Sequence, residues 1–144
     1  MGVVPDGFFH FARTSGLIGS AIHRADRLHP KLSVPPIYRS APLGQPQPVT
    51  RVSLRRDPGD VGLIALGLDP LPPTTIPGVE GLLLTLPVLV VANAVHDGNG
   101  LVEWTIPRIQ PYVAPGLMVH SQGVSQDASG RYFLSNRGIF RLYL

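Results

Sequence analysis

The sequence contains no cysteine. Without thiols the chain can form no disulfide, no zinc–thiolate site and no iron–sulfur cluster, and it has no cysteine nucleophile. The absence does not fix the compartment, because exported proteins can also lack cysteine. It does remove one large group of metal-dependent and redox functions from consideration.

Charge is scarce as well. Charged residues make up 15% of the 144 residues and hydrophobic residues 44%, whereas charged residues account for about 25% of a typical soluble domain. A surface so poor in charge predicts self-association or embedding in a larger assembly. The alternative is a neutral surface coated with serine, threonine and glutamine.

Lysine occurs once, as Lys31, against eleven arginines, and the net charge is +3. The densest basic cluster is Arg51, Arg55 and Arg56. On a strand, Arg51 and Arg55 would share one solvated face. Nucleic-acid binding calls for a denser patch with interleaved aromatic residues. The pattern therefore does not favour nucleic acid, but Arg51 and Arg55 remain candidates for a partner surface.

Long apolar runs are missing too. No segment reaches the roughly 18 apolar residues that span a bilayer, because the longest stretch, residues 79–95, is interrupted by Glu80, Thr85, Pro87 and Asn93. The N-terminus has no basic segment followed by an apolar one, as a signal peptide would. We therefore predict neither a transmembrane segment nor a visible signal peptide.

The first periodic pattern covers residues 8–28 and predicts an amphipathic helix. Gly16 and Gly19 weigh against it by about 1 kcal/mol each relative to alanine, and Pro30 would end it. Such a helix needs a surface to pack on, which is either its own domain or a neighbouring subunit. The candidate assembly residues on this arm are Phe8, Phe11, Leu17, Ile18, Ile22 and Leu28.

A proline-rich stretch follows the arm. Six prolines between residues 30 and 48 disfavour both helix and central strand and predict an extended, semi-rigid connector. The chain is therefore divided into an arm (1–29), a connector (30–47) and a folded domain (48–144). Deleting residues 1–40 is expected to weaken assembly and to leave the domain folded.

From residue 48 onward the pattern changes to short strands separated by turns. Turn signals at 57–60, 97–100 and 127–130 combine aspartate with glycine, and prolines mark loops at 69–77 and 107–115. The strands are expected at 48–55, 61–68, 81–86, 88–95, 101–106, 117–125, 132–135 and 139–144. Without βαβ alternation, this predicts an all-β fold: an antiparallel β-sandwich of seven or eight strands, jelly-roll or immunoglobulin-like, with little parallel pairing.

Several short motifs within residues 41–144 occur in a recognisable order: Pro42-Leu43-Gly44, Asp97-Gly98-Asn99-Gly100, the strand at 116–122 and Leu134-Ser135-Asn136. In this order they resemble a β-sandwich module found at the C-terminal ends of large secreted proteins of planctomycetes and some myxobacteria. The resemblance implies an antiparallel sandwich, an exported location and no catalytic residues. The helical arm departs from that pattern and puts the location in doubt.

Motifs of catalysis and metal binding are absent from the sequence. The five histidines form no metal-ligand pair, and Arg108 stands where a calcium loop beginning at Asp97 would need its last carboxylate. No nucleophile elbow or phosphate-binding loop occurs. We therefore predict no catalytic residues, no metal and no cofactor.

Among the aromatic residues, Tyr112 lies in a proline-flanked loop and is the best candidate for binding a carbohydrate or a partner. Trp104 shares a strand face with Val102 and Ile106, which predicts a core position. The overall interpretation is a structural homo-oligomer, a surface or matrix filament or a virion shell component. The alternatives are a carbohydrate- or partner-binding module and a basic accessory subunit of a ribonucleoprotein.

Overall fold

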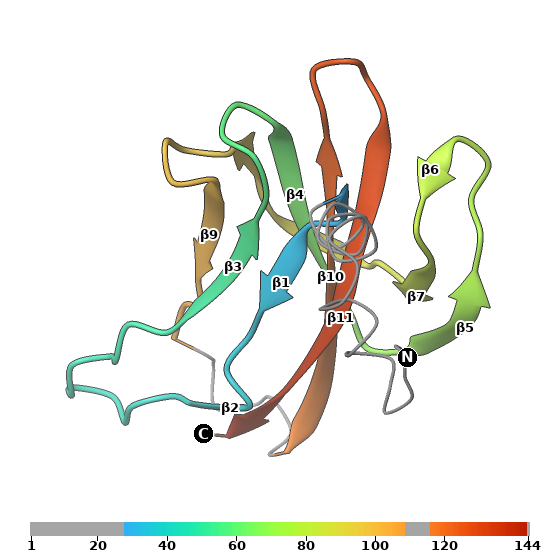
Figure 1. The fold of residues 1–144 in the computed structure, drawn as a ribbon. Coiled ribbons are helices and arrows are strands. Elements are labelled where there is room, and N and C mark those ends of the chain that lie inside the picture. The colour runs from blue at the N-terminus through green and yellow to red at the C-terminus, as the bar shows by residue number, and fades with distance from the viewer. Residues whose placement is uncertain (1–27, 109–115, 144) are drawn as a thin grey trace, which may run out of the picture.

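A computed structural model describes residues 28–108 and 116–143, and the regular secondary structure of this part of the chain consists of strands (Figure 1). The all-β prediction is confirmed at this level. The helix predicted over residues 8–28 lies outside the described residues except for Leu28. The strands are β1 (Lys31–Ser33), β2 (Ile37–Arg39), β3 (Arg51–Arg55), β4 (Val61–Gly67), β5 (Pro70–Thr74), β6 (Val79–Glu80), β7 (Leu83–Thr85), β8 (Leu89–Val95), β9 (Leu101–Thr105), β10 (Leu117–Gln126) and β11 (Tyr132–Tyr143).

These strands form three sheets. One has the order β1-β3-β9, the second the order β2-β11-β10-β4-β8 with β6 beside β11, and the third pairs β5 with β7. Most ladders are antiparallel, as predicted. Among the described residues, parallel pairing is confined to two short places, where β2 and β6 run parallel to β11 over three and two residue pairs.

The larger two sheets contribute side chains to one shared core. Val52 and Leu54 from β3 and Val102 from β9 meet Ile64 from β4 and Phe140 from β11 in a single buried cluster. The alternation predicted for β3 is confirmed, because Val52 and Leu54 are fully buried and the arginines on either side of them are exposed. Burial of this apolar surface is the main force that holds the two sheets together.

Glycines on the six-stranded sheet allow the smaller sheet to approach closely. A Cβ atom added to Gly123 would lie 2.4 Å from Leu54 Cδ1, and one added to Gly138 would lie 2.6 Å from Val34 Cγ1. Both distances are far inside van der Waals contact. These two glycines are therefore needed for close packing between the sheets, and not for a turn or loop conformation.

The proline-rich connector takes part in both sheets. It supplies the edge strands β1 and β2, which is where proline-flanked strands are tolerated. Leu32 and Tyr38 from these strands are 6% and 1% exposed. The core thus extends into the segment assigned to the connector, and a deletion of residues 1–40 would remove two of its side chains. A truncation meant to preserve the fold should end at residue 27.

Two further differences concern the later strands. The strands predicted at 132–135 and 139–144 are one continuous strand, β11. The proline-rich segment predicted as a loop contains β5, which pairs with β7 in an irregular ladder at the margin of the molecule. Prolines fit there because the two-stranded sheet leaves β5 an unpaired edge.

Candidate functional site

The arginine cluster read from the sequence is divided by the fold. Arg51 and Arg55 point outward from β3, as predicted, and Arg51 forms an exposed ion pair with Glu103 at 3.6 Å. Arg55 donates to the carbonyl oxygen of Asn99 at 3.3 Å. Arg56 turns inward, and its side chain is only 5% exposed. The three residues therefore do not form one basic surface.

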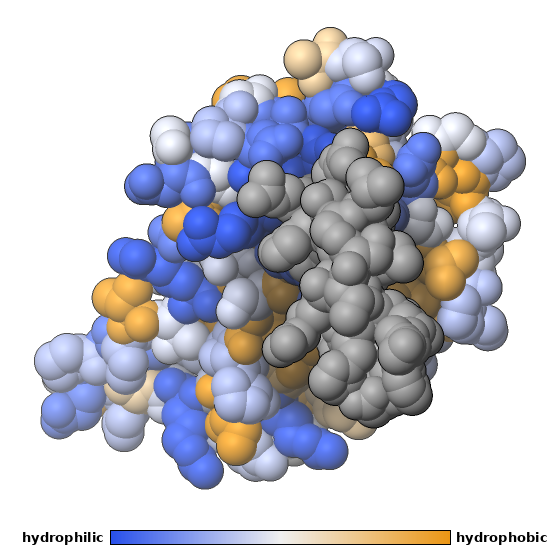
Figure 2. Space-filling model, in the orientation of Figure 1, coloured by the Kyte–Doolittle hydropathy of each residue, from blue (hydrophilic) through white to orange (hydrophobic). Residues whose placement is uncertain are grey.

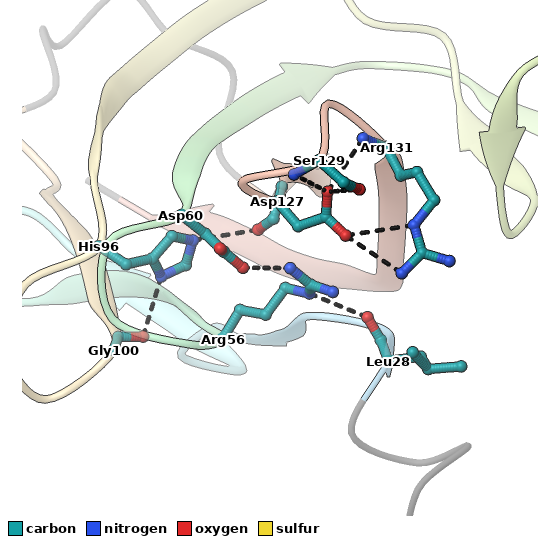
Figure 3. Close-up of polar contacts among 9 residues, drawn as sticks. Leu28, Arg56, Asp60, His96, Gly100, Asp127, Ser129 and Arg131 are labelled. Atoms are coloured by element: carbon teal, nitrogen blue, oxygen red, sulfur yellow. Dashed lines mark hydrogen bonds and ion pairs between the residues drawn. The ribbon is translucent and has the colours of Figure 1, made fainter.

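The inward-facing Arg56 belongs to a polar network at one end of the sheets (Figure 3). Its guanidinium forms an ion pair with Asp60, donates from Nε to the carbonyl oxygen of Leu28 at 2.9 Å, and lies 4.2 Å above the ring of Phe133. The sequence analysis assigned Asp60 to a turn, and the turn is present, since the Asp60 N–H donates to the Asp57 carbonyl at 3.3 Å. In addition, the Asp60 carboxylate neutralises the buried guanidinium of Arg56.

His96 lies next to this ion pair (Figure 3). His96 Nε2 is 3.0 Å from Ser125 Oγ, and His96 Nδ1 is 2.9 Å from the carbonyl oxygen of Gly100. The carbonyl can only accept, so Nδ1 carries the proton and donates it. A hydrolytic triad places a carboxylate at that nitrogen and exposes the serine. Here both side chains are sealed from solvent, at 2% and 0% exposure, and the pair anchors the hairpin between β8 and β9.

The turn between β10 and β11 is built around Asp127, whose Oδ1 accepts hydrogen bonds from the Ser129 hydroxyl at 2.6 Å and from the Ser129 and Arg131 backbone N–H groups at 2.9 and 3.0 Å. These donors, the Ser129 hydroxyl foremost, lower the pKa of Asp127 to about 2. Because the folded pKa lies below the ordinary value, the turn is fully stabilised above about pH 4 and loses this stabilisation as pH falls through about 2.

This turn gives a prediction for titration. The side-chain carboxyl carbon of Asp127, followed by NMR, should titrate with a midpoint near 2, and Ser129→Ala should raise that midpoint toward the ordinary value. Asp97 is the internal control, because its pKa is lowered mainly by backbone N–H groups of Leu101 and Asn99. An Asp127 midpoint that does not move in Ser129→Ala would contradict the role given to the hydroxyl.

An apolar cavity of about 210 Å³ lies between β7 and the six-stranded sheet. Its lining is almost wholly aliphatic, and Gln122 closes one side by bonding the backbone of Leu82, Leu84 and Ser135 at 2.8–2.9 Å. Thr85 Oγ1, at this cavity, and His120 Nδ1 are buried and have no hydrogen-bond partner among the described residues. Burial, followed by the charge of Arg137, lowers the pKa of His120 below its ordinary value.

Among the described strands, β8 has the largest number of exposed large apolar side chains. Leu89, Val90 and Val95 are 58%, 52% and 60% exposed, and Val88 just before the strand is 72% exposed. The face shown in Figure 2, by contrast, carries its exposed apolar residues in separate patches among hydrophilic ones. The sequence marked residues 88–95 as an apolar strand, but it contained no signal that this strand ends a sheet.

The remaining predicted site residues lie mostly outside the described part. Leu28 is described and is 39% exposed, and its carbonyl oxygen holds Arg56. The other arm residues (Phe8, Phe11, Leu17, Ile18 and Ile22) and Tyr112 lie outside the described residues.

No group of three or more histidine and carboxylate side chains could hold a metal ion within residues 28–108 and 116–143. Within the same ranges, no helix has the length and apolar character needed to cross a membrane.

Comparison with known proteins gave no relative: no protein-family model, no curated protein and no solved structure matches the chain.

Proposed function

We propose that the protein is a non-enzymatic structural subunit that associates with copies of itself. The observation that supports this most strongly is the exposed, uncharged strand β8, in a chain with only 15% charged residues. Soluble monomers rarely leave contiguous apolar surface open, because water contact with it is costly and invites association. In this proposal the two sheets that share the core are the layers of an antiparallel sandwich.

The arm also has a role in this proposal. An amphipathic helix over residues 8–28 would add a second contact to a neighbouring subunit. The resemblance to exported β-sandwich modules favours a surface or matrix assembly over a cytoplasmic role, and an extended arm on a small sandwich favours a virion shell as the alternative. The division of the arginine cluster gives no support to the ribonucleoprotein alternative, because Arg56 is engaged internally by Asp60.

The oligomeric state of the intact chain tests the proposal. Sedimentation velocity across the micromolar range should show a dimer or a larger species whose population increases with protein concentration. Sedimentation as a monomer at every concentration would overturn the proposal. Comparison with a chain lacking residues 1–27 separates the contribution of the arm from that of the sheets, since this truncation spares every core residue.

A further inference from the structure

The sheets end in several edge strands, and most of these are protected against pairing with another chain. Short length, charged side chains and proline are the usual protections. β1 and β2 have three residues each and carry Lys31 and Arg39, and β6 has two. β9 carries Glu103 in an ion pair, and β5 contains three prolines.

β8 has none of these protections. It is seven residues long, contains neither a charged residue nor a proline, and has Asn93 as its single polar side chain. It pairs with β4 on one side and is the last strand of its sheet on the other, within the described residues. In an antiparallel ladder alternate residues direct their N–H and C=O groups away from the neighbouring strand. Among the described residues, the outer side of β8 therefore has no strand partner for its backbone donors and acceptors, which lie between exposed aliphatic side chains.

We propose that β8 pairs antiparallel with β8 of a second copy about a two-fold axis, so that the six-stranded sheet continues across the interface. The inference rests on the proposed function and names the surface and symmetry of the association. A two-fold axis places the same strand opposite itself, so that one surface serves both partners. Every other described edge of a second copy is short, charged or rich in proline, so β8 is the edge that best matches β8.

The absence of charge on β8 keeps local repulsion out of this pairing. Two copies with a net charge of +3 repel each other at long range. Pairing through β8 brings no charged residue of either strand opposite its counterpart, and like charges directly opposite would be destabilising.

The irregular point in the β4–β8 ladder limits the register. The pairing shifts between Ile64–Ala92 and Ala65–Val90, and such a bulge changes the face to which the following side chains point. The regular stretch is Ala92–Val95, and within it Val95 lies on the same face as its partner Val61 on β4. This stretch is where two copies can pair with their faces matched.

The apolar surface continues past the N-terminal end of the strand. Val88 and Leu89 also line a groove of about 280 Å³ whose other walls are aliphatic side chains of β4, β10 and β11. A strand edge alone is small against the roughly 1,200–2,000 Å² that stable interfaces bury. The groove beside it offers the additional apolar area that a stable dimer needs.

A pair of matched lysine variants tests the proposal in the full chain. Val95→Lys places a charge on the edge, and Val61→Lys places one on the neighbouring strand, directly across the ladder and also at an exposed position (60% and 42% exposed). We expect Val95→Lys to raise the dissociation constant about tenfold or more, because a two-fold interface carries the new charge twice. Val61→Lys should change it much less, and circular dichroism reports whether each variant is folded.

Cysteine cross-linking provides a second test that does not depend on the lysine variants folding. The chain has no cysteine of its own, so single cysteines at Asn93, Ala94 and Val95 can be oxidised without background. At least one should form a covalent dimer at protein concentrations where Leu43→Cys, at an 81% exposed loop position, forms none. An oligomer that Val95→Lys does not weaken and that none of the three positions cross-links would overturn the β8 pairing and leave self-association standing. A monomer at every concentration would overturn both.

Discussion

Arg56→Ala should lower the free energy of unfolding by about 3–5 kcal/mol, because removing one partner of a buried ion pair leaves the other charge buried and unpaired. The side chains of Arg56 and Asp60 are 5% and 10% exposed. The substitution also removes the hydrogen bond to the Leu28 carbonyl and the stacking on Phe133. Urea denaturation followed by circular dichroism measures the loss.

Arg51→Ala is the matched control. Arg51 also forms an ion pair, with Glu103, but the two side chains are 55% and 40% exposed, and exposed pairs contribute about 1 kcal/mol or less. If Arg56→Ala proved no more destabilising than Arg51→Ala, burial would not be what makes the Arg56–Asp60 pair important.

Two further variants separate charge from shape. Arg56→Lys keeps the positive charge but loses the planar guanidinium that reaches Asp60 and Leu28 together and stacks on Phe133. Arg56→Met combined with Asp60→Leu removes both charges and should be less destabilising than Arg56→Ala alone, because no buried charge is left without a partner. A double variant as unstable as the single one would indicate that packing, and not charge pairing, dominates at this position.

The local parts of the fold could be predicted from the sequence, because their causes are local. The alternation of β3 buries Val52 and Leu54 as expected. The aspartate–glycine turns form where they were predicted, with Asp97 and Asp127 accepting backbone hydrogen bonds inside their own turns. Period-two burial and turn chemistry are encoded within a few residues of each other.

The predictions that failed depended on contacts distant in sequence. Asn136 and Gly138 look like a break between two strands, but Asn136 bonds the backbone of Leu32 at 2.8 and 3.0 Å, and Gly138 lies against Val34. β11 therefore continues through both residues. A polar residue and a glycine that look like a turn in isolation can be required by a strand more than one hundred residues away.

The candidate site shows the same limit. The sequence identified an apolar segment at residues 88–95, which corresponds to β8. An edge strand and a central strand have the same composition when both are apolar, and only the pairing of the whole sheet distinguishes them. The inward turn of Arg56 was missed for a related reason, since its partners come from Leu28, Asp60 and Phe133.

Gly100→Ala is the second large expected effect. Gly100 ends the turn between β8 and β9 at φ +75°, a left-handed conformation that costs an L-residue about 1–2 kcal/mol. A Cβ atom there would also lie 2.0 Å from the carbonyl oxygen of Arg56, which cannot move without breaking the pairing of the hairpin with residue 56. Overpacking of this kind adds about 1–3 kcal/mol. We expect a total loss of about 2–5 kcal/mol of unfolding free energy.

Two other glycines separate the two causes. Gly130→Ala meets the same backbone cost, at φ +90°, but the nearest atom to its Cβ is Gln126 Nε2 at 3.9 Å. It should lose only about 1–2 kcal/mol. Gly98→Ala, in the same turn as Gly100, has no atom within 4 Å of the added Cβ and no left-handed conformation, so its effect should stay within about 0.5 kcal/mol.

We expect the loss of unfolding free energy to decrease in the order Gly100→Ala, Gly130→Ala, Gly98→Ala. Urea denaturation of the three variants under one condition measures this order. Equal losses for Gly100→Ala and Gly130→Ala would mean that the close approach to Arg56 contributes nothing. The approach has a structural reason: the Gly100 carbonyl oxygen accepts hydrogen bonds from the Arg56 N–H and from His96 Nδ1, both at 2.9 Å. Through these two hydrogen bonds the oxygen connects His96, which follows β8, to Arg56 of the buried network. Strain at Gly100 should therefore weaken both hydrogen bonds.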